Sequence, residues 1–114
     1  MTLLSDVNCS WCGVAIEPGD GWRAGEPVAE RRAAFCRLEH VVPWVMQGAR
    51  WQPGEHGEAR GIDASLTQCA QCGEELPDTW VLLVRHRGEH RIPDAFCSPD
   101  HMGAWARKGG RWAP

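Results

Sequence analysis

Cysteine and histidine residues recur in this chain at spacings that suit a tetrahedral metal ion. A Cys-x-x-Cys clip at 9–12 is followed by a Cys-x-x-x-His clip at 36–40, and the same pair recurs at 69–72 and 97–101. Thiolate and imidazole are ligands that Zn²⁺ prefers, and two ligands on one short segment fix the angle between them. The sequence therefore predicts two Zn²⁺ ions. The expected ligands are Cys9, Cys12, Cys36 and His40 for the first ion and Cys69, Cys72, Cys97 and His101 for the second.

Four protein ligands complete a tetrahedral coordination sphere, which leaves no place on the metal for water or substrate. We therefore predict structural zinc and no enzyme activity. Each ion would contribute on the order of 10 kcal/mol to folding, more than so small a core supplies. An HNH-like nuclease that uses His86 or His90 is an alternative, although no paired carboxylates, phosphate-binding loop or Ser-His-Asp arrangement stands out in the sequence.

Other uses of the six cysteines explain less of the pattern. Disulfide bonds would leave unexplained the histidine that follows the third cysteine of each set by four residues. A redox Cys-x-x-Cys pair is normally accompanied by a βαβ pattern, and an iron–sulfur cluster usually takes four cysteines where each set here has three. A cross-brace, in which clips from different halves share one ion, stays open as an alternative.

The clips belong to an internal repeat with a displacement of about sixty residues. Ala-Phe-Cys at 34–36 recurs at 95–97, and Arg-Trp at 50–51 recurs at 111–112. Because the agreement extends beyond the ligands, we expect a duplicated structural unit. Further matches pair Gly13 with Gly73, Trp22 with Trp80 after a small gap, Trp44 with Trp105, Gly48 with Gly109 and Pro53 with Pro114.

The predicted organisation is a first zinc unit at 1–53, a linker at 54–66 and a second zinc unit at 67–114. The linker is polar, rich in glycine and nearly free of apolar side chains, so we expect it to be flexible. Units of this size seldom fold on a hydrophobic core alone, which agrees with stabilisation by metal.

Each unit is expected to begin with a tight turn and to continue into a β-hairpin. The glycine after each Cys-x-x-Cys clip permits the left-handed conformation that aims backbone N–H groups at the sulfurs. In the second unit, the β-prone run 79–84, a turn around Gly88 and a strand ending at Phe96 predict the hairpin. The first unit has weaker strands at 21–23 and 32–35.

A helix after each hairpin is expected to carry the last ligand. Ser98 as N-cap and Pro99 at the first helical position predict a helix that runs to Lys108. In the first unit, Arg37 is a poor cap, and Pro43 removes a backbone hydrogen bond if it falls inside the helix. We therefore predict that the first helix is kinked, shortened or restarted at Pro43.

Six of the seven tryptophans occupy matched positions, so we expect them in the repeated core. Trp44 and Trp105 follow the ligand histidines by one helical turn and should pack under the hairpins. Trp11 differs because it lies between two ligand cysteines and is matched by the polar Gln71. We predict that Trp11 contacts a partner or covers the metal.

The order of clip, hairpin and helix resembles the treble-clef group of zinc fingers. The Cys-x-x-Cys-Gly and Phe-Cys-x-x-x-His segments look most like the small FCS, MYM or TRASH-type members. The resemblance implies a small, metal-stabilised α+β fold of two tandem treble-clef-like zinc units, each a zinc knuckle, a β-hairpin and a short α-helix. The chain departs from those families at His40 and His101, where they usually place a fourth cysteine.

Composition narrows the class of protein. The formal net charge is −3, with eleven arginines and one lysine, which does not indicate a general nucleic-acid binder. No apolar run approaches membrane-spanning length, and the first six residues have neither a basic start nor a long apolar stretch. We therefore expect a cytoplasmic protein without a membrane partner.

The predicted function is that of a non-catalytic zinc-binding interaction module that docks a protein partner. The alternative is a DNA- or RNA-binding accessory protein that uses the basic second unit. A further alternative is intracellular metal sensing or transfer, which requires labile metal. The residues predicted to contact nucleic-acid phosphates are Arg85, Arg87, Arg91, Arg107, Lys108 and Arg111.

Overall fold

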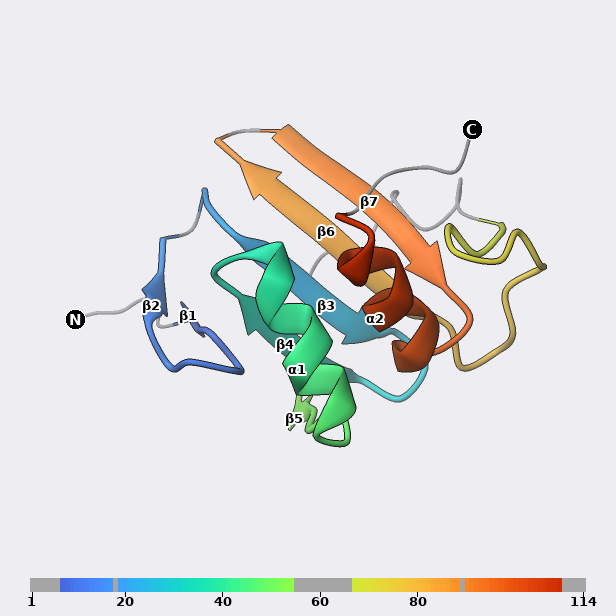
Figure 1. Ribbon diagram of the computed structural model, residues 1–114, viewed down its shortest axis with the longest axis horizontal. Coiled ribbons are helices and arrows are strands. Elements are labelled where there is room, and N and C mark those ends of the chain that lie inside the picture. Colours follow the sequence, from blue (N-terminus) through green and yellow to red (C-terminus); the bar gives the residue numbers. More distant parts are fainter. Residues whose placement is uncertain (1–6, 18, 55–66, 89, 110–114) are drawn as a thin grey trace.

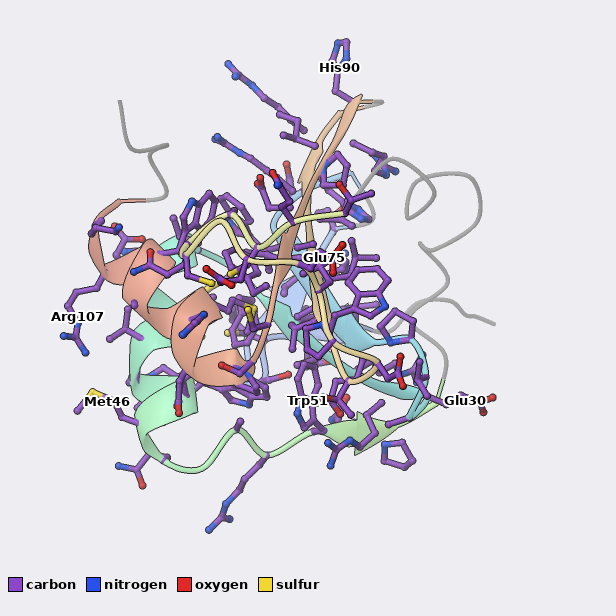
Figure 2. All side chains as sticks on the ribbon, turned by 90° about the vertical axis from the view of Figure 1, so that its right-hand side faces the viewer. Glu30, Met46, Trp51, Glu75, His90 and Arg107 are labelled. Carbon is purple, nitrogen blue, oxygen red and sulfur yellow. The ribbon has the colours of Figure 1, made fainter. Side chains whose placement is uncertain are left out.

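The computed structural model describes residues 7–17, 19–54, 67–88 and 90–109. They form a small α+β fold in which two helices lie side by side on one face of a five-stranded antiparallel sheet (Figures 1 and 2). A separate two-stranded sheet of β1 and β2 lies at one end of the molecule (Figure 1). The elements in chain order are β1 (Val7–Asn8), β2 (Ala15–Ile16), β3 (Trp22–Glu26), β4 (Arg31–Phe35), the 3₁₀ helix η1 (Leu38–His40), α1 (Val41–Met46), β5 (Gln52–Pro53), β6 (Val81–Arg87), β7 (His90–Phe96) and α2 (Pro99–Arg107).

The two halves of the chain meet through their hairpins. β3 pairs with β4 in the first half, β6 pairs with β7 in the second, and β3 pairs with β6 to join them. The strand order β5-β4-β3-β6-β7 therefore makes one continuous sheet from both halves. Of the predicted linker 54–66, only Gly54 belongs to the described residues, and 55–66 lie outside them.

The observed strand register refines one pair of the sequence repeat. Trp22 pairs with Phe35 across the first hairpin, and Val81 pairs with Phe96 across the second. Trp22 is therefore equivalent to Val81, the residue that follows Trp80, near which the sequence repeat placed it. Like residue types favoured Trp80, whereas register is set by strand pairing.

An approximate two-fold axis relates the two hairpins. Ala24 and Leu83 each stand two residues beyond the equivalent positions Trp22 and Val81, and they pair with each other across the seam between β3 and β6. Each hairpin thus presents the same edge to the other. The flanking pairs of the seam are Arg23 with Val84 and Gly25 with Leu82.

The two helices begin differently. The Ser98 Oγ accepts a hydrogen bond of 3.3 Å from the His101 backbone N–H, and α2 starts at Pro99 as predicted. Arg37 provides no side-chain cap, and the chain passes through the 3₁₀ turn η1 before α1. The predicted shortening is confirmed, because α1 has only six residues. Pro43 lies in its first turn, where a missing N–H removes no intrahelical bond.

The core lies between the sheet and the helices, and aromatic rings mark it in the first half. Trp44 of α1 packs edge-on against Phe35 of β4, with ring centroids 5.1 Å apart. Trp51 also packs edge-on against Trp44, with ring centroids 4.9 Å apart. The predicted packing of Trp44 under its hairpin is confirmed, and Trp51 folds back onto the same unit.

The second half repeats this cluster with one ring taken from the first half. Trp105 of α2 contacts Phe96 of β7 at a centroid distance of 5.2 Å, as predicted. Its second aromatic neighbour is Trp22 of β3, at 6.4 Å. The sequence equivalent of Trp51 is Trp112, which lies outside the described residues. The two halves therefore share a core as well as a sheet.

The helices run antiparallel and pack closely (Figure 1). A Cβ atom added at Gly103 of α2 would lie 3.2 Å from the Val45 Cγ1 of α1, so the absent side chain permits the close approach. Among the described residues, no helix has the length and apolar character needed to cross a lipid bilayer.

Candidate metal centres

The first Cys-x-x-Cys clip is a tight turn fastened to β4. The Cys9 N–H donates to the Val14 carbonyl at 2.8 Å, and the Gly13 N–H donates to the Cys9 carbonyl at 2.9 Å. Gly13 has the predicted left-handed backbone, with φ of 82°. The Ser10 N–H donates to the Ala34 carbonyl at 2.6 Å, and the Ser10 Oγ accepts from the Ala34 N–H at 2.9 Å. These bonds fix the clip beside the end of β4, next to the third ligand.

The second clip repeats the same turn. The Cys69 N–H donates to the Glu74 carbonyl at 2.9 Å, and the Gly73 N–H donates to the Cys69 carbonyl at 2.8 Å. Gly73 has φ of 78°. The Ala70 N–H donates to the Ala95 carbonyl of β7 at 2.7 Å. Both clips therefore reach their donor sets by the same local geometry.

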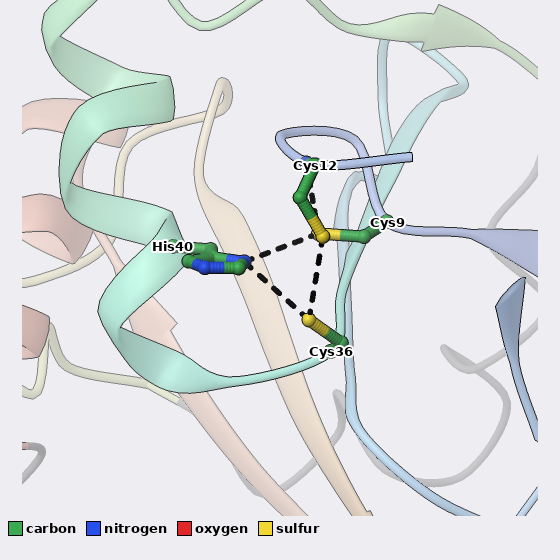
Figure 3. Close-up of side chains that lie close together, drawn as sticks. All are labelled: Cys9, Cys12, Cys36 and His40. Atoms are coloured by element: carbon green, nitrogen blue, oxygen red, sulfur yellow. Dashed lines mark hydrogen bonds between the residues drawn. The ribbon is translucent and has the colours of Figure 1, made fainter. Parts of the chain in front are cut away.

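The four predicted ligands of the first half lie together (Figure 3), with one donor atom from each within 4.8 Å of the others. The His40 Nδ1 lies 3.5 Å from the Cys9 Sγ and 3.4 Å from the Cys36 Sγ. The Cys12 and Cys36 Sγ atoms are 3.7 Å apart. One ion at the centre of this group would reach all four donors.

The second donor set has the same dimensions. The His101 Nδ1 lies 3.6 Å from the Cys69 Sγ, and the Cys72 and Cys97 Sγ atoms are 3.4 Å apart. Each set draws on one half of the chain, and the six cysteines are free of disulfide bonds. The observed grouping is thus the one expected within a unit and differs from a cross-brace.

These spacings suit tetrahedral zinc. Zn–S bonds of about 2.3 Å and a Zn–N bond of about 2.0–2.1 Å at tetrahedral angles place sulfurs about 3.8 Å apart and sulfur about 3.6 Å from nitrogen. The observed separations of 3.4–3.7 Å lie close to both values. Three soft thiolates and an imidazole also select Zn²⁺ over hard cations such as Mg²⁺ or Ca²⁺. Both sets could hold a metal ion, and zinc fits best.

The thiols of each set differ in acidity. Burial disfavours the Cys9 thiolate, but hydrogen bonds from the backbone of Cys12 and Cys36 and from the His40 side chain outweigh burial and lower the Cys9 pKa to about 6. Burial and the neighbouring sulfurs of Cys12 and Cys9 raise the Cys36 pKa to about 11. One sulfur ionises readily and its neighbour resists, so a cation is needed to hold both as thiolates, and metal binding releases protons.

The second set shows the same division. Burial again opposes ionisation of Cys69, yet hydrogen bonds from the backbone of Cys72 and Cys97 and from the His101 side chain lower its pKa to about 6. Burial and the sulfurs of Cys72 and Cys69 raise the Cys97 pKa to about 12. The two centres are therefore electrostatic as well as geometric copies.

No family model, curated protein or solved structure matches this chain. The resemblance to small treble-clef zinc fingers therefore stays a prediction. The donor sets that prompted it come together in space, and they carry the argument about function.

Trp11 is exposed on the first clip. Its side chain is 43% exposed, and the neighbouring Val14 is 50% exposed. The equivalent positions on the second clip are the polar residues Gln71 and Glu74. The first clip thus presents an apolar surface that the second clip lacks.

The two histidines near the tip of the second hairpin have different surroundings. His90 is exposed at the start of β7 (Figure 2). His86 is buried on β6, and its backbone N–H donates to the Gly21 carbonyl of the first half at 2.8 Å. His86 is therefore enclosed where β6 meets the first half of the chain, whereas His90 faces solvent.

The predicted basic contacts divide into two groups. Arg85, Arg87 and Arg107 line one cleft. Arg91 instead donates to the Gly88 and His90 carbonyls, both at 2.9 Å, and neither Arg91 nor Lys108 lines that cleft. Arg111 lies outside the described residues. The cleft also includes Arg37, which the sequence did not single out. Arg37 approaches the other three arginines only when the two halves of the chain join.

A buried carboxyl on β7 was not singled out by the sequence either. Asp94 is 4% exposed, and among the described residues its Oδ1 has no hydrogen-bond partner. Burial raises the Asp94 pKa to about 7. Asp94 pairs with Leu83, as Ala33 pairs with Ala24, so the first half has alanine at the equivalent place.

Proposed function

We propose that this chain is a non-catalytic zinc-binding interaction module of the treble-clef kind that docks a protein partner. The observation that carries the metal part is the spacing of the two donor sets, 3.4–3.7 Å between neighbouring donor atoms. The order of clip, hairpin and helix in each half supports the treble-clef assignment.

A structural role follows from the closed donor sets. Three sulfurs and one nitrogen occupy all the positions of a tetrahedral ion, so no substrate would reach the metal. In each half the ion would tie the clip, the hairpin and the helix start into one unit. Unpaired cysteines are typical of reducing compartments, and a cytoplasmic location is proposed on that ground.

The protein partner is proposed to bind at the first clip. Trp11 and Val14 are exposed apolar residues of one hydrogen-bonded turn, and aromatic residues are frequent anchors in protein interfaces. The second clip, with Gln71 and Glu74 in their places, supplies an internal control on the same fold.

Metal analysis tests the first part of this proposal. We expect two zinc equivalents per chain in freshly purified protein and one equivalent in Cys36→Ser or Cys97→Ser. Zinc that survives a competing chelator at neutral pH would support a structural role. Ready loss of both ions, with the fold intact, would instead support metal sensing or transfer.

Cross-linking in the native cell, with a photoreactive amino acid placed at Val14, tests the partner. We expect one specific protein adduct that Trp11→Ala abolishes and Gln71→Ala leaves unchanged. Equal adducts in both variants, or none with wild type, would contradict docking at the first clip.

A further inference from the structure

A cleft of about 620 Å³ lies where the two halves of the molecule meet. Its walls come from the turn before β3, the segment around η1, the end of β6 and the end of α2. These segments are distant in the sequence and converge only because β3 joins β6 and α1 packs beside α2. The volume lies within the range of small-molecule sites.

Four arginines from three of these segments line the cleft. Arg37 precedes η1, Arg85 and Arg87 belong to β6, and Arg107 ends α2, where Figure 2 shows it projecting outward. The Arg85 Cζ lies 5.3 Å from the centroid of the Trp22 ring, which holds this guanidinium against the wall. The arginines are therefore gathered by the tertiary fold and do not form one solvated run of sequence.

The lining is positive although the chain is negative. Among the described residues that line it, the acidic ones are Asp20 and Glu39, which leave a formal excess of two positive charges against −3 for the whole chain. A Zn²⁺ ion with three thiolates at the neighbouring Cys36 site would carry a charge of −1, so the cleft stays positive.

Within the described part of the chain, none of the four guanidinium groups forms an ion pair. The ion pair found there joins Arg31, which is outside the cleft, to Glu26. Like charges brought together without partners repel one another, and a concave site concentrates their field. An anionic ligand would relieve that repulsion.

We propose that this cleft binds the phosphate of a nucleotide, either free or within a single-stranded nucleic acid. Guanidinium groups hold phosphate oxygens through paired hydrogen bonds, so four of them in one cleft suit a phosphate group. The carboxylates of Asp20 and Glu39 are acceptors suited to ribose hydroxyls or to the exocyclic amines of a base. A phosphorylated side chain would leave those acceptors unused. This site is separate from the protein-docking surface at Trp11 and can fail without affecting it.

The test uses the zinc-loaded full chain and a fluorescein-labelled single-stranded ten-nucleotide DNA at 50 mM salt. We expect the double variant Arg87→Glu/Arg107→Glu to weaken binding at least tenfold. The matched control is Arg32→Glu/Arg50→Glu, which changes the net charge equally on residues outside the cleft, and we expect less than a twofold change. Zinc content and circular dichroism verify that the variants are folded.

Competition and a local probe identify the ligand. Displacement of the DNA by AMP, with a shift of the Trp22 indole N–H resonance, would support a free nucleotide. A shift with DNA alone would support a strand. The proposal would be overturned by no binding to either probe, by equal losses in the cleft and control variants, or by a phosphoserine peptide that binds as tightly as the DNA.

Discussion

The two halves of the molecule carry the same donor set on the same scaffold, but they support that scaffold by different means. The first half has an uncapped six-residue helix and an aromatic cluster built entirely from its own side chains. The second half has a capped nine-residue helix, strands of seven residues, and a cluster completed by Trp22 of the first half. Donor geometry is retained while helix length and core composition vary, which indicates that the metal centre is the invariant part of the unit.

Loss of one metal ligand tests this comparison with the largest expected effect. Cys9→Ser and Cys69→Ser should each remove one zinc equivalent and on the order of 5–10 kcal/mol of folding free energy. We expect the Cys9 variant to lose more helicity in its own half, since α1 has no cap to sustain it. Zinc analysis with denaturant unfolding gives both values. Equal zinc content in variant and wild type would refute the ligand assignment.

At Gly21 the two halves are built differently, because the equivalent residue in the second half, one before Val81, is Trp80. Its φ is 77°, and an added Cβ would lie 2.7 Å from the Phe35 carbonyl oxygen and 2.8 Å from a methyl group of Ile16. Gly21→Ala should therefore destabilise the fold by about 3 kcal/mol or more, from backbone strain and overlap together. The control is Gly48→Ala, where φ is 103° but the space is open, with an expected cost of about 1 kcal/mol. Equal unfolding free energies for the two variants would contradict this account.

Asp94 distinguishes the halves by charge, because Ala33 holds the equivalent place in the first half. Its pKa is about 7 in the fold against 3.8 for a free carboxyl, so the folded chain binds more protons between these values. This group's contribution to stability should therefore fall as pH rises from about 4 to about 7 and then level off.

The isosteric variant Asp94→Asn removes the pH-dependent contribution of this carboxyl to stability. At pH 8, where wild type buries a carboxylate, the variant should be more stable than wild type by about 1–3 kcal/mol of unfolding free energy. At pH 6, where Asp94 of wild type is mostly protonated, the difference should be smaller. Unfolding at both pH values in excess zinc measures the difference. A constant difference between the two proteins would exclude titration of Asp94 as the cause.

The helix caps offer the smallest effect and a direct exchange between halves. Arg37 and Ser98 both have extended backbone at the N-cap, but only Ser98 accepts a hydrogen bond from the N–H three residues later. Ser98→Ala should cost about 1 kcal/mol, and Arg37→Ser should stabilise the chain by a similar amount. Thermal unfolding of the zinc-loaded variants measures both. A loss of stability in Arg37→Ser would show that Arg37 makes a compensating contact.

Local chemistry made much of this molecule predictable from its sequence. The clip glycines and the Ser98 cap depend on near neighbours in the chain, and each lies as expected. The first helix is short, as expected, although Pro43 lies in its first turn and removes no intrahelical bond. The donor sets were predictable because ligand type and spacing are written in short segments. The pairing of β3 with β6 was not predictable, since the residues of an edge strand do not indicate which other strand it will pair with. The arginine cleft and the position of Trp22 beside Trp105 both depend on that seam.

The two-fold relation between the hairpins bears on how such a chain arose. Contacts in which the same surface meets itself are those of a symmetric pair of identical subunits. A polypeptide of half this length would offer its β3-like edge to a second copy, with Ala24 and Leu83 marking the point where the copies cross. Fusion of the two genes would make that association intramolecular and independent of concentration, and each half could then diverge. A cleft lined by both halves could form only once the two edges had met, because neither half alone carries all of its walls.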